Sequence, residues 1–170
     1  GSDYTIREIT PSEGYLLDET IYPVGAEPGN FTLENNSIPM TATEDVILGS
    51  IAITKHTDKP AESSDSDQIE QPEEGAQFQI YLASAGSYEN AKETERDLLT
   101  TDSYGFARSK DLPYGLYVVH QTKGAQGQKF VPDFSVFISE HGKTYYFILN
   151  NPTFTSLIRF EKKDAESGKI

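Results

Sequence analysis

Short runs of alternating apolar and polar residues recur along the chain, and Gly, Pro, Asn and Asp lie between the runs. The clearest run is 76–82 (AQFQIYL). Because successive side chains of a strand point to opposite faces, this run predicts a strand with one buried and one solvated face. Short strands at such spacing are typical of an all-β sandwich. The runs predicted as strands are 4–9, 20–24, 30–34, 50–55, 76–82, 98–101, 106–109, 116–121, 134–138, 144–150 and 156–160.

Two segments break this pattern. Residues 87–96 (SYENAKETER) begin with Ser and contain mostly good helix formers, so they predict one short surface helix. Residues 58–74 (DKPAESSDSDQIEQPEE) carry acids, Ser and Pro with almost no apolar side chains. This composition predicts a long solvated loop.

Parts of the chain resemble one another. The run 4–8 (YTIRE) is similar to 117–121 (YVVHQ), and 50–55 (SIAITK) is similar to 156–162 (SLIRFEK). In both pairs, the repeats that the similar runs define do not begin and end where the chain begins and ends. The simplest account is a tandem array of repeats that is cut out of register.

A tandem array predicts three pieces of structure. Residues 1–48 would form the last strands of one domain, residues 49–152 a complete domain, and residues 153–170 the first strand of the next. The opening Gly1-Ser2 is typical of an expression remnant. We therefore expect the chain to be a fragment of a longer protein.

The negative charge of the chain disfavours partners that are themselves negatively charged. Its 170 residues include 14 Lys and Arg against 27 Asp and Glu, which gives a formal net charge of −13. A chain this acidic repels phosphate backbones and anionic membrane surfaces, so we expect neither nucleic acid nor a membrane as a partner. The sequence has no run of roughly 18 apolar residues, the length that predicts a membrane-spanning helix.

Side chains that commonly carry catalysis or bind metals are scarce. Cysteine is absent, which excludes disulfides, thiol nucleophiles and zinc–cysteine sites. His56, His120 and His141 have no carboxylate beside them at metal-ligand spacing, and no Gly-rich phosphate loop or nucleophile elbow occurs. We therefore expect no enzyme activity, no metal and no cofactor.

A set of ordered motifs is more specific than these patterns. In order, they are 49–55 (GSIAITK), 75–81 (GAQFQIY), 99–107 (LTTDSYGFA), 112–119 (LPYGLYVV) and 145–151 (YYFILNN). With these motifs, residues 49–152 resemble a Cna B-type domain, the SpaA-like, prealbumin-fold module of pilins and surface adhesins in Gram-positive bacteria. The flanking runs 4–15 and 162–169 resemble parts of neighbouring domains of the same kind.

The resemblance implies a seven-stranded, immunoglobulin-like β-sandwich that serves as a stalk or spacer on the outside of the cell wall. Its partners would be neighbouring domains of the same chain, and a host or extracellular-matrix ligand bound through the parent protein. The alternative function is direct ligand binding, because aromatic-rich β-sandwiches also bind glycans and host proteins. Clustering of exposed aromatic side chains would favour that alternative.

The resemblance also implies a covalent cross-link. In many Cna B-type domains, a Lys on the first strand attacks the side-chain amide of an Asn on the last strand, with help from a carboxylic acid. Burial favours the neutral, nucleophilic form of an amine, and a nearby acid can shuttle protons. The matching Lys is Lys55, and the acceptor is Asn151 or Asn150, of which Asn151 is slightly favoured.

The acid position of this family is occupied by Gln121, six residues after the Gly of the Pro-Tyr-Gly turn. Because a glutamine cannot give or take a proton at useful pH, bond formation stays open at this point, and Gln121→Glu is expected to restore it. The alternative is that Lys55 extends to solvent and the two Asn form a turn. Glu8 matches the acid position of the preceding repeat, and Lys162 matches the Lys position of the following one.

Overall fold

The computed structural model describes residues 4–24, 41–58 and 70–151. The chain divides into two compact units, Gly1–Ile47 and Leu48–Ile170. Three features predicted from the sequence, namely the runs 30–34 and 156–160 and the side chain of Lys162, lie outside the described residues.

The first unit contains a short antiparallel pair of strands, β1 (Tyr4–Ile6) and β2 (Tyr22–Val24). Between these strands, the side chain of Glu8 accepts a hydrogen bond from the backbone N–H of Asp18 at 2.7 Å. The hydroxyl of Tyr22 donates to the carboxylate of Asp18 at 2.5 Å. Side-chain hydrogen bonds therefore brace the connection between the two strands.

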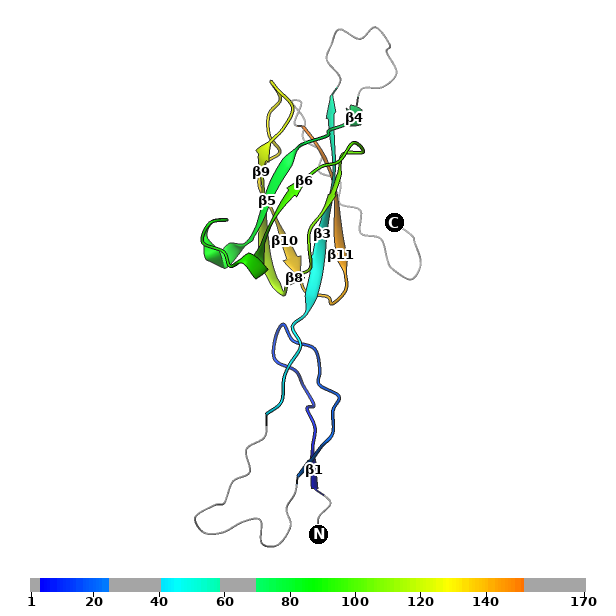
Figure 1. Ribbon diagram of the computed structural model, residues 1–170, viewed down its shortest axis with the longest axis vertical. Helices are drawn as coiled ribbons and strands as arrows, with labels where there is room; N and C mark the ends of the chain where they lie inside the picture. Colours follow the sequence, from blue (N-terminus) through cyan, green and yellow to red (C-terminus); the bar gives the residue numbers. More distant parts are fainter. Residues whose placement is uncertain (1–3, 25–40, 59–69, 152–170) are drawn as a thin grey trace. The chain divides into compact units, whose positions relative to one another are not determined.

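The described residues of the second unit form two sheets (Figure 1). The first sheet contains β5 (Gln77–Leu82), β6 (Arg96–Thr100), β9 (Gly115–Lys123) and β10 (Phe134–Ile138). The second contains β3 (Leu48–Asp58), β4 (Glu70–Pro72), β7 (Phe106–Arg108), β8 (Leu112–Pro113) and β11 (Thr144–Asn150). The first sheet is antiparallel and has the order β10–β9–β5–β6, whereas every strand of the second sheet pairs with β3.

The pairing between β3 and β11 is parallel, and it places the first and last strands of this unit side by side. In this register Leu149 lies opposite Lys55 and Asn150 lies opposite His56. Because both strands run in the same direction, the residue that follows β11 lies at the C-terminal half of β3.

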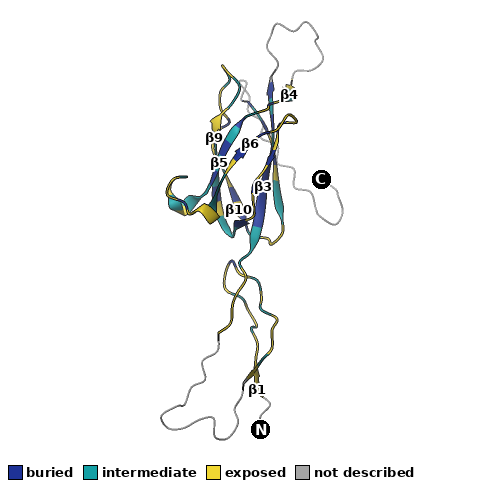
Figure 2. Cartoon of the chain, viewed as in Figure 1, coloured by how far each residue is buried: buried dark blue, intermediate teal, exposed yellow. Residues whose placement is uncertain are grey.

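The core lies between the two sheets, and alternate residues of each strand enter it. In β9, for example, Tyr117, Val119 and Gln121 are buried. Burial raises the pKa of Tyr117, whose hydroxyl donates to the backbone carbonyl of Pro113 at 2.8 Å. Figure 2 shows buried stretches along β3 and β5. The core side chains are those of Ile51, Ile53, Ala76, Phe78, Ile80, Leu99, Ala107, Leu112, Tyr117, Val119, Val131, Val136, Ile138, Phe147 and Leu149.

All seven runs predicted as strands within residues 49–152 are strands in the structure, so the all-β prediction is confirmed. Two further short strands, β4 and β8, were not predicted. β4 lies inside the acidic segment 58–74, where composition alone indicates a loop.

The surface helix predicted over residues 87–96 is largely absent. Its only helical element is a 3-10 turn at Glu93–Glu95, and Arg96 already belongs to β6. The guanidinium of Arg96 donates to the backbone carbonyls of Tyr88 and Glu89, so a side chain satisfies groups that a helix would have used internally. A segment this short also gains little from helix propensity because nucleation is unfavourable.

Candidate functional site

Lys55 is a fully buried cation within the sandwich. It lies on β3, and its side chain has a relative exposure of 0%. Ile51 and Ile53 precede it at alternate positions and are also buried, so strand periodicity carries its side chain into the interior. An ammonium in such a place requires polar partners, because removing it from water is costly.

Three acceptors surround the Nζ of Lys55. It donates to Oε2 of Glu73 at 2.7 Å, to Oδ1 of Asn151 at 2.6 Å, and to the backbone carbonyl of His56 at 2.6 Å. Glu73 and Asn151 each have a relative exposure of 4%. The site therefore brings an amine, a carboxyl group and a side-chain amide together in the absence of bulk water.

The two candidate acceptors lie in different surroundings. The side chain of Asn151 faces Lys55, and its Nδ2 donates to Oγ1 of Thr57 at 2.8 Å. The side chain of Asn150 donates to the carboxylate of Glu70 at an exposed position and accepts the backbone N–H of Asn151. The structure thus brings Asn151 to Lys55 and places Asn150 away from it.

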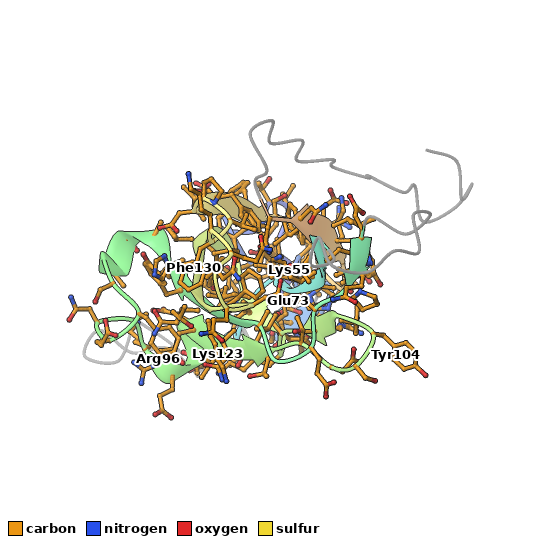
Figure 3. All side chains as sticks on the ribbon, turned by 90° about the horizontal axis from the view of Figure 1, so that it is seen from above. Lys55, Glu73, Arg96, Tyr104, Lys123 and Phe130 are labelled. Atoms are coloured by element: carbon orange, nitrogen blue, oxygen red, sulfur yellow. The ribbon has the colours of Figure 1, made fainter. Side chains whose placement is uncertain are left out.

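Glu73 is the site residue that sequence reasoning missed (Figure 3). It lies between β4 and β5, in the segment predicted as a solvated loop. Its backbone is held on both sides, because its N–H donates to the carbonyl of Lys55 at 2.9 Å and its carbonyl accepts the hydroxyl of Thr101 at 2.6 Å. Its Oε1 accepts the backbone N–H of Ala125 at 2.6 Å. The available signal was only its position two residues before Gly75, where the motif 75–81 begins.

Gln121, which occupies the acid position implied by the resemblance, is buried with a relative exposure of 2%. Its Oε1 accepts the backbone N–H of Val131 at 2.8 Å, and its Nε2 donates to the carbonyl of Lys123 at 3.1 Å. These hydrogen bonds join Gln121 to the segment after β9. The carboxyl group beside Lys55 comes from Glu73.

A close backbone contact fixes the position of Lys55. The backbone N–H of Lys55 donates to the carbonyl of Gly105 at 2.7 Å. Gly105 has a φ of +73°, and a Cβ atom there would lie 2.3 Å from the carbonyl oxygen of Lys55. Only glycine combines this conformation with this approach.

The remaining candidates lie apart from this site. Glu8 braces the first unit through Asp18. His120 pairs with Asp133 at 2.7 Å on the surface, and His141 accepts the backbone N–H of Leu48 at 3.2 Å. Within the described ranges, no three His, Cys, Asp or Glu side chains gather as metal ligands would, and no helix has the length and apolar character needed to cross a membrane.

Comparison with known proteins identifies the fold. A family model described as the SpaA prealbumin-like fold domain matches residues 61–153. The chain belongs to this family. Membership confirms the prealbumin-like sandwich that the ordered motifs predict. No curated protein matches the sequence significantly.

Solved structures resemble this SpaA-type chain at low sequence identity. The Bacillus anthracis TIE protein is 23% identical with a TM-score of 0.61, and the match covers 87% of this chain and 24% of that chain. The minor pilin GBS52 of Streptococcus agalactiae is 23% identical with a TM-score of 0.45, covering 68% and 51%. The shaft pilin SpaA of Lactobacillus rhamnosus GG is 21% identical with a TM-score of 0.44, covering 61% and 49%. The SpaA-type chain thus spans about a quarter of the length of the first of these proteins and about half of the other two.

Proposed function

We propose that the second unit is a structural module of a Gram-positive surface protein or pilus, and that a covalent amide bond between Lys55 and Asn151 locks it. One observation carries the proposal: the buried Nζ of Lys55 contacts both Oδ1 of Asn151, at 2.6 Å, and Oε2 of Glu73, at 2.7 Å. Membership of the SpaA family supports the structural role.

The bond forms in three steps. Nζ of Lys55 first transfers a proton to Oε2 of Glu73 and becomes a neutral amine. The amine then attacks Cγ of Asn151, giving a tetrahedral intermediate. Glu73 passes its proton to Nδ2 and takes one from Nζ, so that the Cγ–Nδ2 bond breaks and ammonia leaves. The product is one amide bond beside a neutral Glu73, and the core no longer holds a buried ion pair.

Thr57 orients the acceptor for this reaction. Its Oγ1 accepts the hydrogen bond from Nδ2 of Asn151, which leaves Oδ1 directed at Nζ of Lys55. The hydroxyl therefore distinguishes the nitrogen that leaves from the oxygen that stays. Positioning of this kind lowers the barrier because the reacting groups are already in place.

The position of the bond suits a module under tension. A pull on the chain enters the second unit at the N-terminal end of β3 and leaves after β11, and these two strands are parallel neighbours. Their ladder is then loaded in shear. A bond from Lys55 to Asn151 carries the force past residues 56–150, so the sandwich stays folded under load.

The arrangement of neighbouring domains belongs to the same proposal. In this account residues 1–48 are the last strands of a preceding domain, and residues 153–170 begin a following one on a cell-wall protein. Support comes from the first unit, where large apolar side chains are exposed as expected for strands without the rest of their sandwich. They are Tyr4, Ile6, Ile9, Tyr15, Leu17 and Ile21. A chain extended upstream should protect them from proteolysis, and unchanged cleavage would count against this assignment.

Ligand binding is a second candidate function, and one observation favours it. On β9 and β10, Leu116 and Phe137 lie opposite each other and are both 47% exposed. The ring of Tyr114 packs edge-on against that of Phe137 at 5.1 Å. Loss of glycan or matrix-protein binding in Phe137→Ser, with folding intact, would support this function, whereas binding unaffected by the substitution would exclude this surface.

Intact-mass measurement tests the proposed bond. The wild-type chain is expected to weigh less than its sequence mass by one ammonia, and Lys55→Met is expected to keep its full mass. Wild-type protein that is folded and retains its full mass would contradict the proposal.

A further inference from the structure

The side chain of Gln121 ties the end of β9 to the segment that follows it. Its Nε2 donates to the carbonyl of Lys123, the last residue of β9, and its Oε1 accepts the backbone N–H of Val131. Val131 itself is buried in the core with a relative exposure of 5%. One buried amide side chain thus constrains where the intervening residues lie. This needs a side chain that both donates and accepts a hydrogen bond, as the amide of Gln does.

The segment that Gln121 holds reaches the reactive site. The backbone N–H of Ala125 donates to Oε1 of Glu73 at 2.6 Å. Next to it, Gly124 leaves no room for a side chain: a Cβ atom would lie 2.6 Å from Nε2 of Gln121 and 3.1 Å from Oε1 of Glu73. Gln121, Gly124 and the carboxylate of Glu73 are therefore packed against one another.

From this geometry we infer that Gln121 is a positioning residue for the cross-linking reaction: it holds the segment 124–131 so that the Ala125 N–H binds Oε1 of Glu73. The inference rests on the proposed function. Gln121 thereby has a different role from the acid expected at its position, because Gln121 acts on Glu73 through the backbone of the segment 124–131 and does not exchange protons.

The hydrogen bond from Ala125 favours one oxygen of Glu73 as the carrier of its proton. The carbonyl oxygen of a protonated carboxyl group accepts an N–H better than the hydroxyl oxygen does, so the Ala125 N–H on Oε1 favours the proton on Oε2. Oε2 is the oxygen that contacts Nζ of Lys55. Without the Ala125 N–H, the proton can occupy either oxygen, and one of the two faces away from the reacting groups.

Two kinetic variants and one matched control test this role. Gln121→Leu removes both side-chain hydrogen bonds, and Ala125→Pro removes the N–H donor itself. Val131→Ala is the control, because it loosens the same segment through lost packing and keeps every hydrogen-bonding group. Chains that have not yet folded or reacted, recovered from inclusion bodies under denaturing conditions, are refolded at a series of pH values and quenched in acid. The fraction that has lost ammonia is read by intact mass.

We expect Gln121→Leu to react about tenfold more slowly than wild type, the factor that loss of one hydrogen bond to a charged group produces. Val131→Ala should slow the reaction by less than about threefold at matched stability. The double variant Gln121→Leu/Ala125→Pro should be no slower than Ala125→Pro alone, because both substitutions remove the same interaction, the hydrogen bond from Ala125 to Glu73. The pH profile of the rate should change in Gln121→Leu and match wild type in Val131→Ala, because only the former releases the Ala125 N–H from the carboxylate of Glu73.

Amide hydrogen exchange provides a readout that does not need the bond. In the unreactive Asn151→Ala background, which keeps Lys55 and Glu73, the Ala125 N–H should exchange slowly. Adding Gln121→Leu should speed its exchange by at least about tenfold. If wild type keeps its full mass, the proposed function fails, and the exchange measurement still decides whether Gln121 holds the Ala125 N–H on Glu73. A wild-type reaction rate in Gln121→Leu, equal slowing by Val131→Ala, or an Ala125 amide that stays protected would each overturn the inference.

Discussion

The Nζ of Lys55 lies 2.6 Å from Oδ1 of Asn151, although the two residues are 96 positions apart in the sequence. The parallel pairing of β3 and β11 produces this contact, since it places the end of the last strand beside the interior of the first. Both side chains are buried, so the contact excludes the water that would otherwise solvate an ammonium. An amide bond at this point would join β3 to the residue that directly follows β11.

Replacement of each Asn in turn should show whether Asn151 or Asn150 is the acceptor. We expect Asn151→Ala to keep its full mass and to lose about 2–4 kcal/mol in its free energy of unfolding, by analogy with removal of a disulfide. Asn150→Ala is the matched control and should still lose ammonia, because its side chain contacts Glu70 at an exposed position. Mass spectrometry and guanidinium unfolding give both results. Loss of ammonia from Asn151→Ala would exclude it as the acceptor.

Replacement of the acid should stop the reaction. Glu73→Gln is nearly isosteric and can still accept the Ala125 N–H, but it cannot take a proton from Lys55. We expect this variant to keep its full mass. We also expect it to lose about 3–5 kcal/mol in its free energy of unfolding relative to an unreacted wild-type chain, because a buried ammonium loses its carboxylate partner. Ammonia loss at the wild-type rate in Glu73→Gln would show that another group supplies the acid.

The structure also changes the expectation for Gln121→Glu, which was predicted to restore a missing acid. A carboxyl group is already present at Glu73. The substitution would replace the donor to Lys123 with a carboxylate and put two carboxyl groups against Gly124. We now expect slower bond formation than in wild type, measured by the same refolding and mass assay, and a faster reaction would contradict this interpretation.

Much of the fold could be predicted from the sequence because its signals are local. Spacing and alternation predict the seven strands within residues 49–152, and the resemblance carried by the ordered motifs implies that they form a sandwich. Lys55 and Asn151 could be proposed together because the resemblance implies that the first and last strands are neighbours. For the helix at 87–96, local propensity gave the wrong answer, since Arg96 satisfies the carbonyls of that segment from its place in β6.

Glu73 could not be predicted in the same way. It lies in a segment whose acids, Ser and Pro indicate a solvated loop, and its own residue type is consistent with that reading. Its role depends on contacts that are distant in sequence, with the backbone of Lys55, the hydroxyl of Thr101 and the N–H of Ala125. Composition and periodicity contain no information about these contacts.

The close approach at Gly105 provides a test of how β3 is positioned. Gly105→Ala would place a Cβ atom 2.3 Å from the carbonyl oxygen of Lys55 at a φ of +73°. We expect a loss of about 2–4 kcal/mol in the free energy of unfolding, from backbone strain together with overpacking. Gly127→Ala is the control, because its φ is +78° but no atom lies within 4 Å of the added Cβ. Equal losses in the two variants, measured by guanidinium unfolding, would mean that the contact with Lys55 is unimportant.

Removal of the Thr57 hydroxyl should slow the reaction without preventing it. Thr57→Val keeps the shape of the side chain but leaves Nδ2 of Asn151 without its acceptor, so the amide can rotate. We expect the refolding and mass assay to show about tenfold slower loss of ammonia. Thr57→Ser retains the hydroxyl and should react at close to the wild-type rate. A Thr57→Val chain that reacts as fast as Thr57→Ser would remove Thr57 from the mechanism.

Intact mass combined with peptide mapping shows whether Lys55 and Asn151 are covalently joined in the folded protein. We expect purified wild-type protein to be lighter than its sequence mass by one ammonia. Digestion should release a branched peptide joining Lys55 to Asn151, and this peptide should be absent from Glu73→Gln. A folded wild-type protein with its full sequence mass, and with Lys55 and Asn151 in separate peptides, would show that the bond does not form.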